Sequence, residues 1–242
     1  MNNNETAVII PAYNEGKNLQ ILVTKITNNF PGIEIVIVDD SQKEENLLLK
    51  KALANFKKVT ILSREKKQGR GSAVIFGMKE ALKNKKNKYF FEMDADLAHD
   101  PLEFPQFFSA SEKYDMVVGS RYLTKSRIIK WPLYRLVQSK VINFLLKYWL
   151  GIKLSDYTNG FRLYKRSAVE FIVVQKLKEA GYISLSEIAF KLKKARLPNG
   201  QRKFKIGEVP TSFTDRTYGK SNADAKELLR SLVGAVRIRL NG

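Results

Sequence analysis

The chain contains no cysteine and only one histidine, His99, in 242 residues. Without cysteine the fold cannot depend on disulfide bonds, and a thiolate metal site is excluded. A single imidazole also excludes any catalytic scheme that needs a pair of histidines. Chemistry must therefore come from carboxylates, arginines, lysines and hydroxyl groups.

Long apolar runs are also missing. No stretch reaches the roughly 20 uncharged apolar residues that a membrane-spanning helix needs. The nearest one, 131–150, is interrupted by Arg135, Lys140 and Lys147. The opening residues, MNNNETAVII, lack the basic start and apolar length of a secretory signal. We therefore expect a cytoplasmic protein that lies on the cytoplasmic face of a membrane without crossing it.

Acidic residues are few relative to basic ones, 24 against 43, and the formal net charge is +19. A field of this sign attracts nucleic acid, anionic lipid headgroups or phosphorylated substrates, and charge alone does not choose among them. The hydrophobic content of 44% indicates a folded chain.

In the first half, short β-branched runs alternate with longer helical patterns. This alternation predicts an α/β fold with a mostly parallel sheet covered by helices. The predicted strands are 7–10, 34–38, 59–62, 89–93 and 116–118, and the predicted helices lie near 17–29, 44–56, 72–83 and 102–113. In the second half we expect a helix over 131–150, a strand over 206–213 and a basic amphipathic helix over 224–240.

Polar clusters follow the predicted strands, where ligands of parallel sheets bind. The clearest is Asp94 and Asp96, one residue apart after an apolar strand. Mg²⁺ and Mn²⁺ prefer oxygen ligands and commonly share them with substrate phosphates. A solvated turn is the alternative when such a pair stands alone, but the other strand-end clusters favour a metal site. Those clusters are Tyr13-Asn14-Glu15, Asp39-Asp40, Arg64 and Ser120-Arg121.

A glycine-rich segment, Gly69-Arg70-Gly71, opens the helix predicted near 72–83. Backbone N–H groups at such a helix start can approach a phosphate, although an ordinary loop is an equal alternative. Val74 stands where the dinucleotide fingerprint needs its third glycine, and Thr214 stands where a P-loop ending in Gly219-Lys220-Ser221 needs its first.

His99 precedes a helix start with Asp100 as N-cap, Pro101 at the first position and Glu103 completing a capping box. Asp100 and Glu103 are therefore predicted to be structural. For His99 a local structural role and a contact near the metal or acceptor both remain open.

The 131–150 segment carries a polar stripe at every fourth residue, Arg135, Ser139, Asn143 and Lys147, with apolar residues opposite. A basic amphipathic helix with tryptophans near both ends is typical of the bilayer interface. A helix that faces the protein core is the alternative.

Taken in order, these motifs resemble the family 2 glycosyltransferases, and among them the dolichol-phosphate mannose synthases and related polyprenyl-phosphate glycosyltransferases. The resemblance runs from about residue 7 to residue 240. It rests on Pro11-Ala12-Tyr13-Asn14-Glu15, Val38-Asp39-Asp40, Gly69-Arg70-Gly71, Met93 to His99, Gly119-Ser120-Arg121-Tyr122, Trp131 with Arg135, Ser139 and Asn143, Asn159-Gly160-Phe161-Arg162, Glu187, Glu208-Val209-Pro210, and Arg216 with Gly219-Lys220-Ser221.

The resemblance implies a GT-A fold, with a Rossmann-like sheet, flanking helices and a C-terminal region for the acceptor and interface helices. It implies one catalytic domain over 1–242, with donor binding in about 1–122 (the N-terminal half) and acceptor binding in about 123–242 (the C-terminal half). Catalytic roles are implied for Asp94, Asp96, Arg121, Arg135 and Arg216, with Asp94 and Asp96 holding the metal. Donor contacts are implied for Pro11, Ala12, Tyr13, Glu15, Asp39, Asp40, Gly69, Arg70 and Ala95, and acceptor contacts for Ser139, Asn143, Arg162 and Lys220.

The activity implied is inverting transfer of a hexose, with mannose favoured, from a nucleotide sugar such as GDP-mannose to a polyprenyl or dolichyl phosphate, with Mg²⁺ or Mn²⁺. An anionic membrane surface is the implied partner, a small membrane-anchoring subunit is admitted, and no nucleic acid is expected. Three positions depart from the family pattern. The residues after Asp40 differ, Ala98 replaces a glutamine that ligates metal in some relatives, and Asn222 follows Ser221 where relatives have lysine.

Other functions compete with this one. A relative using UDP-glucose or UDP-GlcNAc with a glycan or protein hydroxyl would need a carboxylate base, and none is evident. A nucleotidyltransferase would need a glycine-rich loop after its first strand, where this chain has Pro11 to Glu15. A noncatalytic nucleic-acid-binding protein fits the net charge, but an acidic pair at a strand end is a poor surface for a polyanion.

Overall fold

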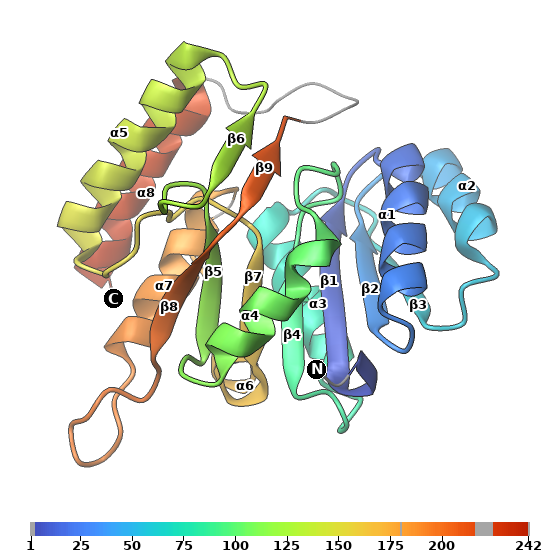
Figure 1. The fold of residues 1–242 in the computed structure, drawn as a ribbon, viewed down its shortest axis with the longest axis horizontal. Coiled ribbons are helices and arrows are strands. Elements are labelled where there is room, and N and C mark those ends of the chain that lie inside the picture. The colour runs from blue at the N-terminus through green and yellow to red at the C-terminus, as the bar shows by residue number, and fades with distance from the viewer. Residues whose placement is uncertain (1–2, 180, 216–224, 242) are drawn as a thin grey trace.

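The computed structural model describes residues 3–179, 181–215 and 225–241 (Figure 1). A seven-stranded sheet runs in the order β3-β2-β1-β4-β7-β5-β8. Its strands are β1 (Thr6–Ala12), β2 (Glu34–Asp39), β3 (Val59–Ser63), β4 (Tyr89–Glu92), β5 (Met116–Ser120), β7 (Arg162–Lys165) and β8 (Ile206–Pro210). A separate two-stranded sheet pairs β6 (Arg127–Ile129) with β9 (Ser212–Thr214). The helices are α1 (Gly16–Asn29), α2 (Lys43–Leu53), α3 (Arg70–Ala81), α4 (Phe104–Ser111), α5 (Leu133–Leu150), α6 (Arg166–Val173), α7 (Ile183–Lys194) and α8 (Ala225–Asn241), with 3₁₀ turns η1 (Asn3–Glu5) and η2 (Pro101–Glu103).

The predicted parallel sheet is confirmed for β1 to β4, which pair in parallel with one another. β7 was not predicted, and it runs antiparallel to both β4 and β5 in the middle of the sheet. The single strand expected over 206–213 is wrong. The chain leaves the main sheet at Thr211, so that β8 pairs with β5 and β9 pairs with β6.

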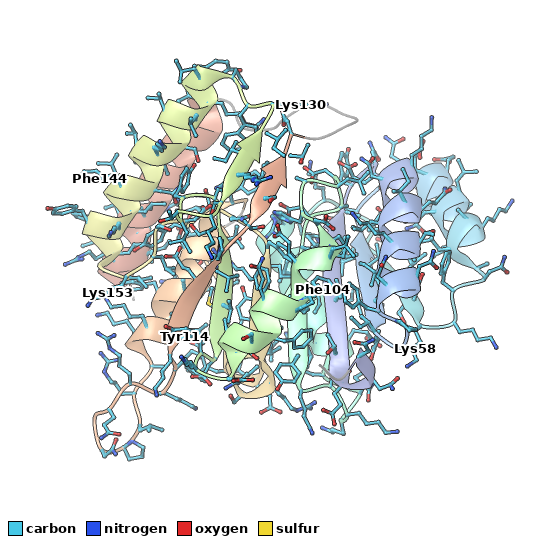
Figure 2. All side chains as sticks on the ribbon, viewed as in Figure 1. Lys58, Phe104, Tyr114, Lys130, Phe144 and Lys153 are labelled. Carbon is cyan, nitrogen blue, oxygen red and sulfur yellow. The ribbon has the colours of Figure 1, made fainter. Side chains whose placement is uncertain are left out.

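Helices cover both faces of the sheet, each over its own apolar core. One core joins α1, α2 and α4 to the sheet through residues such as Leu22, Leu49 and Phe104. The other joins α3, α6, α7 and the ends of α5 and α8 through residues such as Met78 and Leu146. Phe104, labelled in Figure 2, is the first residue of α4 and is fully buried. The predicted α/β architecture, a mostly parallel sheet with flanking helices, is confirmed.

α5 and α8 lie side by side at one end of the molecule (Figure 1). Three of the four residues in the α5 polar stripe face inward, since Asn143 is buried and Arg135 and Ser139 bond to neighbouring elements, whereas Lys147 is exposed. The apolar face points outward instead: Phe144 is 61% exposed and Tyr148 is 79% exposed. The alternative of a helix that faces the protein core holds for part of α5, because Leu146 and Leu150 are buried in that core. A membrane contact of the outer face stays a prediction. Within the described part of the chain, no helix combines the length and the apolarity that crossing a bilayer requires.

Candidate active site

Three parallel strands, β1, β2 and β4, end at the same edge of the sheet. They bring together the polar segments that lie at or after their ends: Tyr13 to Glu15, Asp39-Asp40 and Asp94 to Asp96. The Asp40 amide donates to the Ala12 carbonyl at 3.0 Å, and the Asn14 amide donates to Ser41 Oγ at 2.7 Å. Asn14 has φ 58°, a left-handed conformation that asparagine tolerates and that turns the chain sharply after β1. The strand ends thus form one continuous rim.

The predicted donor residues of the first loop lie on this rim. Tyr13 is exposed, and the Lys67 ammonium lies 3.9 Å from its ring centroid, so the loop after β1 meets the loop before α3. Glu15 accepts a hydrogen bond from Asn18 Nδ2 at 2.6 Å. Pro11 and Ala12 form the end of β1, and Gly69 precedes α3 with φ 90°, where a side chain would be strained.

Asp39 and Asp40 end β2 and each has protein partners. Asp39 is buried and accepts from Asn46 Nδ2 at 2.7 Å and from the Ser41 amide at 3.1 Å. Asp40 binds Arg64 through two bonds of 2.6 Å, and Arg64 also donates to Ser72 Oγ. These bonds shape the loop in which donor contacts are predicted.

Asp94 follows β4 and forms an ion pair with Arg70 from the glycine-rich segment. The Arg70 Nε and Nη2 atoms donate to Asp94 Oδ1 at 2.9 and 2.8 Å, and Nη1 donates to Glu92 Oε1. The other Glu92 oxygen accepts from the Tyr164 hydroxyl at 2.8 Å. Burial alone would lower the Arg70 pKa, but attraction to Asp94 and Glu92 raises it above its ordinary value.

Gly160 lies against this ion pair. A Cβ added at Gly160 would meet the Arg70 guanidinium and lie 2.9 Å from Asp94 Oδ1. Glycine at this position therefore lets the loop before β7 pass over the acidic strand end. This explains one residue of the Asn159 to Arg162 motif in physical terms.

His99 fixes the backbone of the acidic pair. Its Nδ1 accepts from the Asp94 amide at 3.2 Å, so the proton lies on Nε2, which donates to Asn159 Oδ1 at 2.8 Å. Asn159 Nδ2 in turn donates to the Gly119 carbonyl, and the imidazole stacks on Phe161. The structural role for His99 is confirmed: its imidazole holds the backbone of Asp94.

The helix start after His99 is confirmed only in part. Asp100 caps the turn by accepting from the Leu102 amide at 2.9 Å. Glu103 does not complete a capping box, because its carboxylate accepts from Thr211 Oγ1 and from the Ser212 amide at 2.8 Å. It holds the bend between β8 and β9 instead.

Asp94 and Asp96 fit a divalent ion that takes its remaining ligands from a substrate and water. Both are carboxylates at the rim; Asp94 is partly exposed, and Asp96 is mostly buried, with one oxygen accepting from the Ala98 amide at 3.2 Å. Among the described residues, no group of three or more His, Cys, Asp or Glu could hold an ion by itself. Two protein carboxylates are the number usual for Mg²⁺ sites that share substrate phosphates.

Arg121 is buried beside the acidic rim. It forms two bonds to Asp156, of 2.7 and 2.8 Å, and a third to Thr158 Oγ1 at 2.8 Å. Burial alone would raise the Asp156 pKa, but the charge and hydrogen bonds of Arg121 lower it. The same ion pair, with a further contribution from Asp94, raises the Arg121 pKa despite burial.

Trp131 lies close to two arginines that are predicted to be catalytic, Arg121 and Arg135. The guanidinium carbons of Arg121 and Arg135 are 5.1 and 4.3 Å from its ring centroid. Arg135 also donates to Asp215 Oδ1 at 2.7 Å. Trp131 Nε1 is buried and has no hydrogen-bond partner among the described residues. We call Arg121, Trp131 and Arg135 the arginine cluster.

Of the predicted acceptor residues, Ser139 and Asn143 lie on α5 and Arg162 lies on β7. Ser139 accepts from the Tyr122 hydroxyl at 2.6 Å, and Asn143 is buried and accepts from the Tyr157 amide at 2.6 Å. Arg162 is 0% exposed and donates to the carbonyls of Asn159, Tyr157 and Leu185. In this structure Arg162 therefore supports the fold and does not face an acceptor. Arg216 and Lys220 lie outside the described residues.

Sequence reasoning missed Glu92 and Asp156, the buried partners of Arg70 and Arg121. A charged residue inside an apolar strand, as in Phe90-Phe91-Glu92-Met93, is a usable signal because a buried carboxylate requires a cation or donor. Asp156 lies in a polar loop and offers no comparable signal. A cavity of about 670 Å³ beside α3 was also not predicted, and none of the residues predicted to bind donor or acceptor lines it.

Comparison with known proteins identifies the family of the chain. Residues 7–173 match the model of glycosyl transferase family 2. The chain is 32% identical over 230 residues to polyprenol monophosphomannose synthase of Mycolicibacterium smegmatis, covering 94% of this chain and 84% of that protein. It is 34% identical over 235 residues to dolichol-phosphate mannosyltransferase of Pyrococcus furiosus, covering 94% of this chain and 62% of that longer relative.

Among solved structures, glucosyl-3-phosphoglycerate synthase from Mycobacterium tuberculosis, in complex with Mn²⁺, UDP and glucosyl-3-phosphoglycerate, aligns with a TM-score of 0.66 at 15% identity. The alignment covers 98% of this chain and 80% of that one. The fold and the family match define a GT-A glycosyltransferase. The chain belongs to glycosyl transferase family 2.

Proposed function

We propose that this glycosyltransferase transfers mannose from GDP-mannose to a polyprenyl or dolichyl phosphate and inverts the anomeric centre. The names of the two relatives at 32% and 34% identity support this substrate pair. The observation that carries the proposal is the arginine cluster: a buried indole N–H that has no partner among the described residues lies beside two guanidinium groups. Such a set of donors suits a phosphate.

On the donor side, Asp94 and Asp96 would hold Mg²⁺ or Mn²⁺ with the diphosphate. When bound, the ion supplies charge stabilisation for the departing nucleoside diphosphate without proton transfer. His99 keeps the Asp94 backbone in place, and the rim of Tyr13, Asp39 and Asp40 would hold the nucleoside. Arg70 bonds to the Asp94 carboxylate and would contact the diphosphate.

On the acceptor side, a phosphate monoester needs no general base, because its second pKa is about 6 and the attacking oxygen is already charged near neutral pH. Arg121 and Arg135 would reduce the repulsion between the two phosphorylated substrates. Direct attack by this oxygen displaces the nucleotide and inverts the sugar. Arg216 and Lys220 remain predicted phosphate contacts outside the described residues.

We further propose that the enzyme rests on an anionic membrane through α5, from which a lipid phosphate could enter under the helix. The exposed apolar residues of α5 support this, and Phe144 lies on its outer side (Figure 2). Lys140 and Lys147 are exposed on the same helix and suit anionic headgroups. A small membrane-anchoring subunit would be compatible with this surface.

The test is a transfer assay with Mn²⁺, a panel of GDP and UDP sugars, and three acceptors: a short polyprenyl phosphate, the matching polyprenol and a simple sugar. We expect transfer from GDP-mannose to the phosphate only, giving the inverted anomer. Efficient transfer to an alcohol, or retention at the anomeric carbon, would contradict the proposal. Transfer from a UDP sugar to a hydroxyl acceptor would identify the competing function, that of a relative acting on a glycan or protein hydroxyl. Salt-dependent nucleic-acid binding without sugar-nucleotide binding would identify the noncatalytic one.

A further inference from the structure

Arg70 bridges two carboxylates, one at the rim and one in the core. Its guanidinium bonds to Asp94 through two nitrogens and to Glu92 through the third. Glu92 is 0% exposed, while the Asp94 side chain is 20% exposed. The same cation therefore joins a permanently buried charge to the carboxylate that is proposed to bind metal.

Glu92 cannot easily release this arginine. It lies on β4 between β1 and β7, and the Tyr164 hydroxyl is the partner of its second oxygen. A buried carboxylate that loses its cation is strongly destabilised, so Glu92 holds Arg70 in place whether or not a ligand is bound. Gly160 packs against Arg70 and Asp94, and a larger side chain at this position would collide with the guanidinium.

We propose that Arg70, held by Glu92, is a resident counter-cation of Asp94 that opposes binding of a divalent ion by itself. A bare ion would meet a carboxylate whose charge is already neutralised and a guanidinium that repels it. An ion that arrives with a nucleoside diphosphate brings negative oxygens that Arg70 can contact. Metal and donor would then bind together, and Glu92 would be a positioning residue. This inference rests on the proposed metal site.

The informative variant carries Arg70→Gln with Glu92→Gln. It removes the counter-cation without leaving a buried charge, and the net charge of the protein is unchanged. The matched control carries Lys88→Gln with Glu5→Gln, an exposed ion pair of 2.8 Å that involves neither Asp94 nor Asp96. Asp96→Asn reports on the metal site itself. Thermal unfolding of each variant shows whether it is folded.

The measurement is a Mn²⁺ titration followed by the electron paramagnetic resonance of the free ion, first without ligand and then with GDP. In the wild type we expect weak binding of Mn²⁺ alone and a large gain with GDP. The Arg70/Glu92 variant should bind Mn²⁺ alone at least about 10-fold more tightly, because a positive charge next to the ligand is gone. Its gain with GDP should shrink, and the control should match the wild type.

Two failures can be told apart. If Asp96→Asn binds Mn²⁺ as the wild type does, the metal site is misplaced and the inference falls with it. If Asp96→Asn loses the ion but the Arg70/Glu92 variant binds it no more tightly than the wild type, the metal site stands and the role of Arg70 as counter-cation is wrong.

Discussion

α1 and α5 are both amphipathic, but they face opposite ways. α1 buries Leu19, Leu22 and Ile26 against the sheet and leaves mostly polar residues outside. α5 turns Arg135, Ser139 and Asn143 inward and leaves Phe144 and Tyr148 outside. Burial of apolar surface against the sheet explains the orientation of α1, whereas the outer face of α5 has no such partner among the described residues.

The two helices also differ in the layer that each one covers. In the N-terminal half, acidic strand ends meet an apolar core. In the C-terminal half, α5 covers a layer of ion pairs and hydrogen bonds that includes Arg121, Asp156 and Asp215. A helix with this orientation suits a boundary at which a charged headgroup lies inside and hydrocarbon lies outside. The following experiments test the contrast, from the largest expected effect to the smallest.

Asp156→Asn should break the layer under α5 most severely. It leaves Arg121 buried without its anion, which costs about 3–5 kcal/mol of the free energy of unfolding. The Asp156 pKa is lowered in the folded state, so its stabilisation is present above the ordinary pKa of about 3.9 and is lost as pH falls through the folded value. Urea unfolding at pH 7 and below pH 4 should show the difference from the wild type narrowing in acid. Adding Arg121→Gln should restore much of the loss at pH 7, and no restoration would argue against the buried ion pair.

Asp96→Ala should impair catalysis at the donor site of the N-terminal half without unfolding the protein. We expect transfer to fall at least about 100-fold, because the leaving diphosphate loses its charge partner. Asp100→Ala is the matched control, since Asp100 caps η2 and pairs with Lys25 away from the rim. Full transfer in excess chelator would contradict the assignment of the acidic pair.

Arg135→Ala should affect the acceptor and spare the donor. Loss of a charged contact to the phosphate should lower transfer by about 10-fold or more, with the affinity for GDP-mannose unchanged. Arg135→Lys should rescue poorly, because an ammonium cannot reproduce the guanidinium fork. Arg127→Ala, on exposed β6, is the control. A matching loss of donor affinity would place Arg135 at the donor instead.

The outer face of α5 can be tested with Phe144→Glu and Tyr148→Glu together. Removing two apolar side chains of about 1.5–3 kcal/mol each should lower vesicle binding by about 10-fold or more. Ile21→Glu with Leu48→Glu alters exposed apolar residues of α1 and α2 and should change nothing. Flotation with anionic and with neutral vesicles separates electrostatic attraction from apolar insertion. Equal recovery of the α5 variant and the control variant would reject α5 as the membrane contact.

Periodicity predicted the first five strands, β1 to β5, and most helices because these elements follow one another with local patterns. β7 was not predicted because it is short, begins with a charged residue and pairs with two antiparallel neighbours that are far away in sequence. The split of the last predicted strand depends on Glu103, which bonds the bend at Thr211 and Ser212. No local pattern carries such a long-range bond.

The acidic rim was predictable because parallel strands bring their ends to one edge, whatever the details of packing. The ion pairs that organise it were not. Arg70 meets Asp94 and Arg121 meets Asp156 only through the path of the loops around β7. For α5 the amphipathic pattern was correct, but it could not tell which face points inward, because either face can be buried.

The position of β7 also sets the order in which the sheet can be completed during synthesis. β5 leaves the ribosome well before β7, yet only β7 joins it to β4 in the finished sheet. Until then β4 presents an open edge, which is a hazard for pairing with other chains. The nascent chain must therefore wait for the segment that carries Gly160 and Arg162. A premature stop before that segment would leave an unfinished sheet, and not a smaller working enzyme.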